Sequence, residues 1–372
     1  MTQLRRTFAI VCIGGILAAC ASVGGGGGGT ATNGIPGTPG QNAGAPNAIW
    51  PVKTREHVDL WLHGFALLQE DTTFVPFFRR GYSTNMIVLK NRANVVTQLD
   101  ANRDKLRARL AANPQLINAQ FVPLSFASWA DLSQAVDIFT RANGDPRAAS
   151  SQQQASAIAF LAAYFPTSAD RDWLRLFVQS LSDESTKFYH SYWTEQQREK
   201  SNVLELVDTL WQRTYRPRMQ RFLNNTQQAA GDVLLSLPLD GEGRSLTNGK
   251  QSNVFTVTFP DRPNDAAQAI YVIAHEAASG IAATAVTDNI TPEQRRTGVG
   301  ERYQSAGAVR GGALLLQRTS PELADGYMRY YLASVNRAPG ANVQATFVAT
   351  FTLPDTIRDA LTRQLDVVLG GI

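Results

Sequence analysis

Apolar residues recur every three or four positions between residues 50 and 228, which is the period of a helix with one buried face. Val58 and Leu62 follow this spacing in one segment, and Leu106 and Leu110 follow it in another. Polar residues fill the intervening positions, so each helix has an apolar stripe suited to packing on its neighbours. The pattern predicts helices over residues 55–69, 92–113, 128–144, 150–165, 168–200 and 203–227, the last bent near Pro217.

The pattern of the chain changes at Gly231. Residues 232–239 form a short apolar run, and residues 252–260 alternate, with Phe255 and Val257 on one face. Glycine and polar residues between the two segments are typical of a turn-rich connection. Both segments are therefore predicted to be β-strands.

Helices return after the second strand. Asn264 or Asp265 is expected to cap the helix that contains His275 and Glu276, and Ser320 is expected to cap a later one. The remaining elements are expected as helices over residues 300–319 and 320–334, a late strand over 342–354 and a closing helix over 354–370. The chain is thus predicted to be α+β and predominantly helical, with a helical region over residues 50–230 followed by a sheet-containing region over 231–372.

Residues 1–20 have the composition of an export signal. Two arginines precede an apolar run too short to span a membrane, and the segment ends in the letters LAAC. This ending resembles the lipobox of bacterial lipoproteins, whose cysteine is lipidated and becomes the mature N-terminus. The resemblance assigns a lipid to Cys20, and Ala21 in place of an aspartate favours the outer membrane, facing the periplasm. The alternative is an ordinary signal peptide with an incidental cysteine.

Residues 21–49 are rich in glycine and proline and are predicted to be a flexible tether. Cys12 leaves with the signal and Cys20 takes the lipid, so the mature domain has no thiol for a disulfide, a metal or a nucleophile. Without the two signal arginines the formal net charge of +4 falls to about +2, which gives no indication of nucleic-acid binding. No strongly apolar run of membrane-spanning length follows the tether, so the membrane is expected to be reached through the lipid on Cys20 alone.

The helix around His275 is almost free of ionisable side chains. Between Asp265 and Asp288 only His275 and Glu276 can carry a charge, and their neighbours are small or apolar. A helix that is apolar on nearly all sides is a buried helix. Because a buried carboxylate is costly without a partner, Glu276 is expected to contact a cation, a metal or a histidine, or to hold a proton.

The order of strand, helix with His275-Glu276 and later helix resembles the core of gluzincin metallopeptidases over residues 231–320. The resemblance implies zinc as cofactor, with His275 and Glu301 as ligands and Glu276 as the general base acting on a peptide substrate. The chain departs from the HExxH motif at Ser279, which occupies the position of the second histidine. This departure puts the metal site and the catalytic activity in doubt, because catalytic zinc sites have three protein ligands.

The competing interpretation is a buried structural pair. Glu276 would then contact His275 and a cation such as Arg310, which lies on the following helix beside two glycines that allow close approach. In that case the chain is a non-catalytic envelope lipoprotein that binds another envelope component. Stoichiometric zinc would favour the metallopeptidase-like interpretation, and a metal-free ion pair would favour the binding protein.

Residues 75–82, VPFFRRGY, combine aromatic residues with two arginines. Two interpretations stay open for this segment. It lines a site for an anionic ligand, or it is a connection between helices whose arginines are solvated. His57 and His63 are six residues apart on a predicted helix, so they face different sides and no shared metal site is expected.

Overall fold

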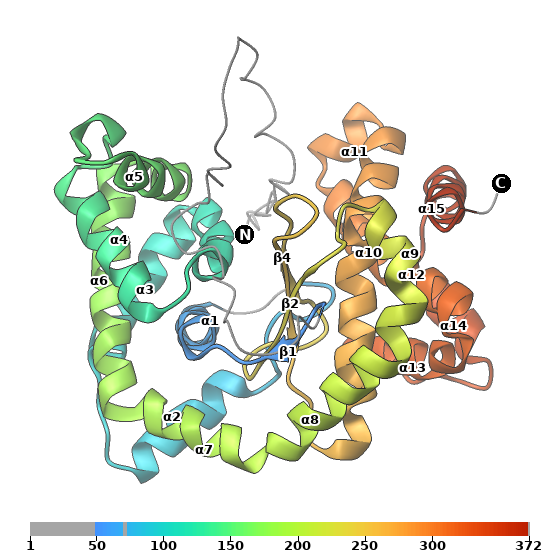
Figure 1. The fold of residues 1–372 in the computed structure, drawn as a ribbon, viewed down its shortest axis with the longest axis horizontal. Coiled ribbons are helices and arrows are strands. Elements are labelled where there is room, and N and C mark those ends of the chain that lie inside the picture. Colours follow the sequence, from blue (N-terminus) through green and yellow to red (C-terminus); the bar gives the residue numbers. More distant parts are fainter. Residues whose placement is uncertain (1–48, 70–72, 371–372) are drawn as a thin grey trace, which may run out of the picture.

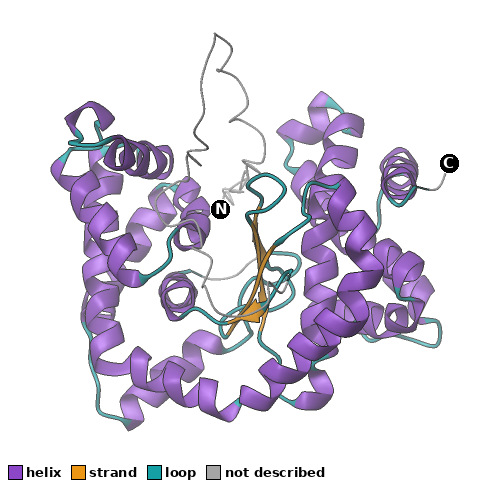
Figure 2. Ribbon diagram, in the orientation of Figure 1, coloured by secondary structure: helices purple, strands orange, loops and turns teal. Residues whose placement is uncertain are grey.

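A computed structural model describes residues 49–69 and 73–370. The protein is predominantly helical α+β, with 71% of residues in helices and 6% in a small mixed sheet, as the sequence predicts. Figure 1 shows the sheet between two layers of helices, with α7 and α8 passing from one layer to the other. Figure 2 shows how little of the chain is strand.

The sheet has four strands in the order β1-β2-β4-β3. Strands β1 (Val52–Lys53), β2 (Gly231–Ser236) and β4 (Asn253–Thr258) run parallel, and β3 (Arg244–Leu246) runs antiparallel to β4. The two predicted strands correspond to β2 and β4, which are adjacent along their whole length.

The alternation of side chains divides the interior into two hydrophobic cores, one on each face of the sheet. Val233 and Val257 point into the core formed with the C-terminal helices. Leu234 and Val254 point into the core formed with the N-terminal helices. Because successive side chains of a strand face opposite sides, β2 and β4 contribute to both cores and are buried on both faces.

The layer on the N-terminal side surrounds one buried helix. In α1 (Glu56–Leu68) every residue after Glu56 is buried, including the polar residues His57, Asp59 and His63. Around it pack α2 (Tyr82–Arg92), α3 (Gln98–Ala112), α4 (Trp129–Arg141), α5 (Gln152–Tyr164), α6 (Ser168–Glu184) and α7 (His190–Glu199). His57 bonds to the carbonyl of Phe126, whereas His63 contacts Tyr82 and Glu184, so the two histidines face different sides as expected.

The long helical segments are interrupted by π-helical turns. One, η3 (Ser185–Tyr189), joins α6 to α7, and another, η4 (Trp211–Tyr215), joins α8 (Ser201–Leu210) to α9 (Arg216–Asn225). Pro217 lies in the first turn of α9, directly after the second irregular turn, where its missing N–H costs least. The boundary between the two cores does not fall at residue 230 of the chain, because residues of α8 and α9 pack in the C-terminal core.

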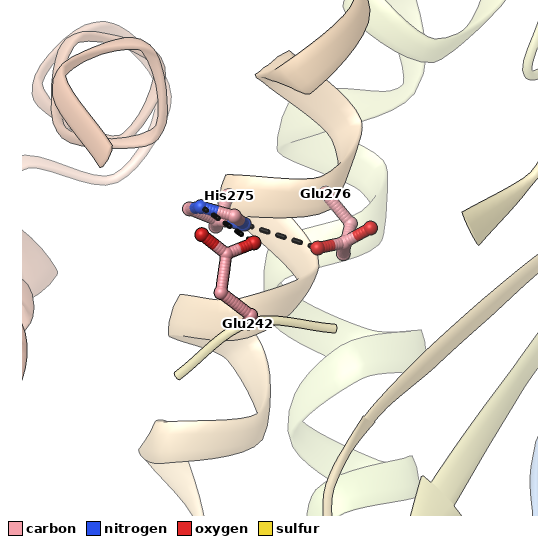
Figure 3. Close-up of side chains that lie close together, drawn as sticks. All are labelled: Glu242, His275 and Glu276. Atoms are coloured by element: carbon pink, nitrogen blue, oxygen red, sulfur yellow. Dashed lines mark hydrogen bonds and ion pairs between the residues drawn. The ribbon is translucent and has the colours of Figure 1, made fainter. Parts of the chain in front are cut away.

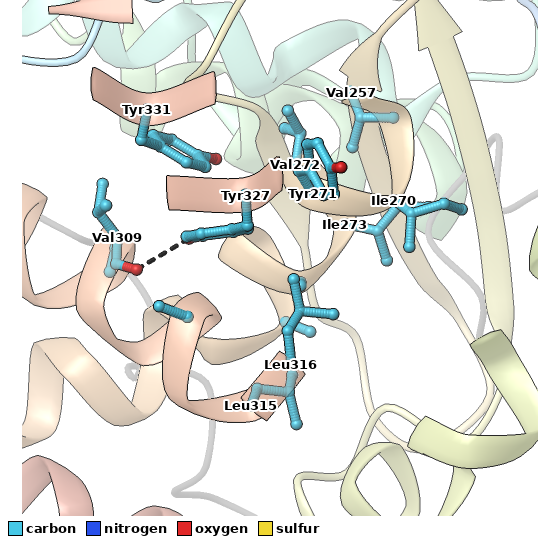
Figure 4. Packing of buried hydrophobic residues seen from close by; sticks show 14 of the residues in the cluster. Val257, Ile270, Tyr271, Val272, Ile273, Val309, Leu315, Leu316, Tyr327 and Tyr331 are labelled. Carbon is cyan, nitrogen blue, oxygen red and sulfur yellow. Dashed lines mark hydrogen bonds between the residues drawn. The ribbon is translucent and has the colours of Figure 1, made fainter. Parts of the chain in front are cut away.

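The C-terminal layer is built on two antiparallel helices, α10 (Ala267–Asn289) and α12 (Val299–Thr319). The helices α11 (Pro292–Arg296), α13 (Ala324–Ser334), α14 (Val343–Thr350) and α15 (Asp355–Val368) complete it. Figure 4 shows the packing of α10, α12 and α13, in which the hydroxyl of Tyr327 donates a hydrogen bond of 2.8 Å to the carbonyl of Val309. Helix α10 is long and apolar enough to cross a membrane, but 72% of its apolar window is buried inside the protein, as in a core helix.

Three local predictions for this half are wrong. The expected strand over residues 342–354 is α14, in which Phe347 and the following Phe351 are buried four residues apart, a helical rather than a strand spacing. Asn264 and Asp265 belong to a short 3₁₀ turn that precedes α10 and do not cap it. Ser320 makes no capping bond either, because a 3₁₀ turn separates it from α13.

Candidate functional site

His275 and Glu276 lie in the middle of α10, enclosed by the C-terminal layer. His275 is 1% exposed and Glu276 is 5% exposed. Helix α12 approaches closely at Gly312, where a Cβ atom would lie 3.1 Å from the Cα of His275 and 2.3 Å from the hydroxyl oxygen of Tyr327. The ring of Tyr331 stacks on the His275 imidazole at 5.5 Å between centroids. The prediction of a buried helix is therefore confirmed.

The carboxylate of Glu276 finds its polar partners within the protein. Its Oε1 atom lies 3.1 Å from Nδ1 of His275 and accepts a hydrogen bond of 3.0 Å from the backbone N–H of Gly243. A Cβ at residue 243 would lie 2.7 Å from Cγ of Glu276 and 2.7 Å from the carbonyl oxygen of Thr256, so only glycine fits. The turn-rich connection between β2 and β3 is thereby attached to α10.

Glu242, on the same connection, completes the group shown in Figure 3. Its Oε2 atom lies 3.9 Å from Nε2 of His275, and Ser305 donates a hydrogen bond of 3.1 Å to its Oε1 atom. One ligand-type atom from each of Glu242, His275 and Glu276 lies within 4.8 Å of the others. Glu242 could not be predicted from the sequence, because nothing in a turn-rich segment shows which helix it will contact.

The three groups shift one another's protonation. Burial alone would lower the pKa of His275, but the charge of Glu242 and the hydrogen bond and charge of Glu276 outweigh it and raise that pKa. Burial would raise the pKa of Glu276, but His275 and the charge of Arg244 lower it. The pKa of Glu242 is raised, chiefly by burial. The imidazole ring of His275 thus lies between two carboxyl groups that favour its protonated form.

The structure does not bring Glu301 to this group, so its predicted role as a metal ligand is wrong. Glu301 lies in the first turn of α12, whereas it is Gly312 that touches His275. The two positions are three helical turns apart, about 16 Å at 1.5 Å per residue. Ser279 is no substitute ligand, since its hydroxyl donates a hydrogen bond of 2.7 Å to the carbonyl oxygen of Glu276.

Arg310 is not the cation beside Glu276, which corrects the second predicted contact. Burial and the charge of Arg358, on α15, lower the pKa of Arg310, and no ion pair joins it to Glu276 in the described part of the chain. The cation whose charge lowers the pKa of Glu276 is instead Arg244 of β3, which is 2% exposed. Its guanidinium lies 3.5 Å from the centroid of the Phe77 ring and donates a hydrogen bond of 2.6 Å to the carbonyl of Gly243.

These residues do not fit a catalytic zinc site. Among the described residues Nε2 of His275 has no hydrogen-bond partner, so this atom faces Glu242 alone, while Glu276 is engaged at Nδ1 on the other side of the ring. Glu276 lies near enough to be a third ligand, but its Oε1 atom would have to leave Nδ1 of His275 and the N–H of Gly243 to bind a metal at Nε2. The enclosure of His275 and Glu276 leaves no room for an extended peptide beside them.

The arginine-rich segment of residues 75–82 lies at a cleft rather than on a plain helix connection. Arg79, Arg80 and Tyr82 line a cavity of about 430 Å³ together with residues that follow β2 and β4. The interpretation of this segment as the wall of a ligand site thus gains a geometric basis.

Cys20 lies outside the described residues.

No family model, curated protein or solved structure matches this chain. The gluzincin resemblance therefore stays an expectation from the order of elements.

Proposed function

We propose that this protein is a non-catalytic, lipid-anchored envelope protein that binds another envelope component, with His275 and Glu276 as a buried structural pair. One observation supports the proposal above the others. The pair is enclosed, and its hydrogen-bonding capacity is directed at the protein's own connection between β2 and β3. A hydrolytic site needs these groups to face a substrate and water.

The buried pair has a structural consequence for the cleft. Glu242 and Gly243 attach the β2–β3 connection to α10, and the same connection bonds to the arginine-rich segment. The backbone N–H of Asp240 donates to the carbonyl of Phe77 at 2.8 Å, and that of Glu242 donates to the carbonyl of Pro76 at 3.0 Å. The pair thus helps to hold the wall that carries Arg79.

The anchoring part of the proposal rests on the sequence. Residues 1–20 as signal, Cys20 as lipid site and residues 21–49 as tether all lie outside the described residues, apart from Ile49. The outer membrane, facing the periplasm, is the location that the residue after the cysteine favours. A tether of this length lets the domain stand away from the bilayer, where a soluble or surface-bound partner can reach its cleft.

The competing function is a zinc-dependent peptidase related to gluzincins, with Glu276 as base. The observation in its favour is the proximity of Glu242, His275 and Glu276, since clusters of such donors bind metals. Against it stand the burial of the pair, the contacts of Glu276 Oε1 with His275 and Gly243, and the distant Glu301.

Metal content distinguishes the two functions. The full chain would be purified in detergent, without a histidine tag or chelator, and its zinc measured by mass spectrometry before and after incubation with zinc. We expect no stoichiometric zinc, and the same result for His275→Ala. About one zinc per chain that disappears in both His275→Ala and Glu242→Ala would overturn the proposal and make peptidase assays the next step.

A further inference from the structure

The cleft lies where parallel strands end. Its lining comes from residues 79–86, 192–200, 237–240 and 258–261 and from Gln268. The third and fourth of these segments follow the carboxyl ends of β2 and β4, the edge at which ligands bind in open sheets with parallel strands. Its volume of about 430 Å³ falls within the range of small-molecule sites.

Positive charge predominates in the cleft, which three cations and two carboxylates line. Asp261 bridges two of the cations, at 2.6 Å from Arg79 and 2.5 Å from Lys200. Arg79 is further held by Thr258, whose hydroxyl it contacts at 3.2 Å. The side chain of Asp261 is 65% exposed, so solvent weakens its ion pairs with the two cations.

Of the three cations, Arg80 is the one whose guanidinium takes part in no ion pair among the described residues. It is exposed, and one of its nitrogens donates a hydrogen bond of 2.5 Å to the carbonyl oxygen of Ser334. No ion pair of Arg80 occurs in the described part of the chain. Beside it, Gln268 brings the first turn of the 23-residue helix α10 to the cleft, and a helix N-terminus favours an anion.

Tyr82, which lines the cleft, belongs to a buried network of polar side chains. The hydroxyl of Tyr82 lies 3.1 Å from Nδ1 of His63, whose Nε2 lies 3.1 Å from Glu184. Lys90 contacts the same carboxylate at 2.7 Å. Each member is buried and paired, so the network holds Tyr82 in place, which is the support that a binding site needs.

The rest of the lining is rich in hydroxyl and amide groups. Asn85, Gln196, Tyr192 and Thr258 offer hydrogen-bond donors and acceptors. A lining of this kind suits a ligand with several hydroxyl groups better than an apolar one, and the excess of cations requires that the ligand carry negative charge.

We propose that this cleft binds a small hydroxylated anion, of the class of a sugar phosphate or a uronic acid. The anionic group contacts Arg80 and competes with Asp261 for Lys200, while the hydroxyl groups bond to the amides of the lining. The inference rests on the proposed binding function and names the site and the class of ligand. Both classes of ligand carry one anionic group on a frame with several hydroxyl groups.

Calorimetric titration of the full chain in detergent tests the inference. The probes are glucose 6-phosphate, glucuronate, glucose and inorganic phosphate. We expect one or both hydroxylated anions to bind, with affinity falling about tenfold or more in Arg80→Ala, because hydrogen bonds to a charged group are lost. Asp261→Asn should bind severalfold more tightly, since a competing carboxylate is removed. Arg363→Ala, an exposed substitution on α15, is the matched control and should leave affinity unchanged.

Each other outcome is decisive. If neither hydroxylated anion binds, or if Arg80→Ala binds like the wild type while thermal melting shows both to be folded, the cleft is not the site. Equal affinity for glucose would contradict the requirement for charge, and equal affinity for inorganic phosphate would contradict the requirement for hydroxyl groups. Which of the two anions binds identifies the anionic group. Failure of this test leaves the metal-content result, and with it the proposed function, unaffected.

Discussion

Replacing Glu276 by glutamine tests how the buried pair stabilises the fold. Oε1 of Glu276 faces two donors, Nδ1 of His275 at 3.1 Å and the N–H of Gly243 at 3.0 Å. Glutamine preserves the shape and an acceptor oxygen but removes the charge. A hydrogen bond to a charged group contributes roughly 1 kcal/mol more than a neutral one, so Glu276→Gln should lower the free energy of unfolding by about 2 kcal/mol. Glu276→Ala, which strands a buried imidazolium, should cost about 3–5 kcal/mol.

The loss should depend on pH in a defined direction. His275 has a folded pKa raised above 6.5, so its contribution is complete below that value and is lost as pH rises through the folded pKa. Glu276 has a folded pKa lowered below 4.5, so its contribution is present above that value and is lost as pH falls through the folded pKa. The stability difference between wild type and Glu276→Gln should therefore be largest between about pH 4.5 and 6.5 and smaller at pH 9.

Chemical denaturation followed by circular dichroism, at pH 5.5 and at pH 9, provides the assay. Glu205→Gln, an exposed substitution on α8, is the control and should change the free energy of unfolding by less than about 0.5 kcal/mol at both pH values. A Glu276→Gln variant as stable as the wild type, or a difference that grows from pH 5.5 to pH 9, would refute the charged pair.

Three further predictions follow from single positions. Gly243→Ala should lower the free energy of unfolding by about 1–3 kcal/mol, because its Cβ would meet Glu276 and Thr256. Gly280→Ala, with open space around a helical position, should raise it by about 0.5–1 kcal/mol. Denaturation curves that rank the two variants the other way would contradict the packing. Glu301→Ala should leave the zinc content of the protein unchanged, as measured by mass spectrometry, since Glu301 lies far from His275. Cys20→Ser should abolish incorporation of labelled palmitate and release the protein from the membrane fraction; retained label would contradict the lipid assignment.

The buried helix and the two long strands could be predicted from the sequence because their signals are local. An almost uncharged stretch around His275 is expected to be shielded from water, and it lies inside the protein. The alternation around Phe255 likewise determines which side chains enter which core. Helix α14 could not be predicted in this way, because residues 342–354 are few and their apolar residues fit both a helical and a strand period. The helical spacing becomes clear only once Phe347 and Phe351 are seen to be buried together.

The partners of the buried pair depend on tertiary contacts that no local pattern records. Glu242 reaches His275 because the β2–β3 connection folds back over α10, and Gly243 permits that approach. Arg310 was the expected cation because it lies on the following helix, but in the structure it lies near Arg358 of α15, and Arg244 of β3 acts on Glu276 instead. Glu301 failed as a ligand for a similar reason, since the antiparallel pairing of α10 and α12 sets which residues are neighbours.

The protonation of His275 tests whether His275 and Glu276 form a buried structural pair or a metal site. Nuclear magnetic resonance of ¹⁵N-histidine-labelled protein resolves the ring nitrogens of the four histidines, and the His275 signals are identified by their loss in His275→Gln. We expect His275 to titrate above pH 6.5, in contrast to His57 and His63, whose pKa values burial lowers. We also expect the His275 signals to stay in place when zinc is added. A neutral ring at pH 6, or a nitrogen signal that shifts on addition of one equivalent of zinc, would contradict the structural pair.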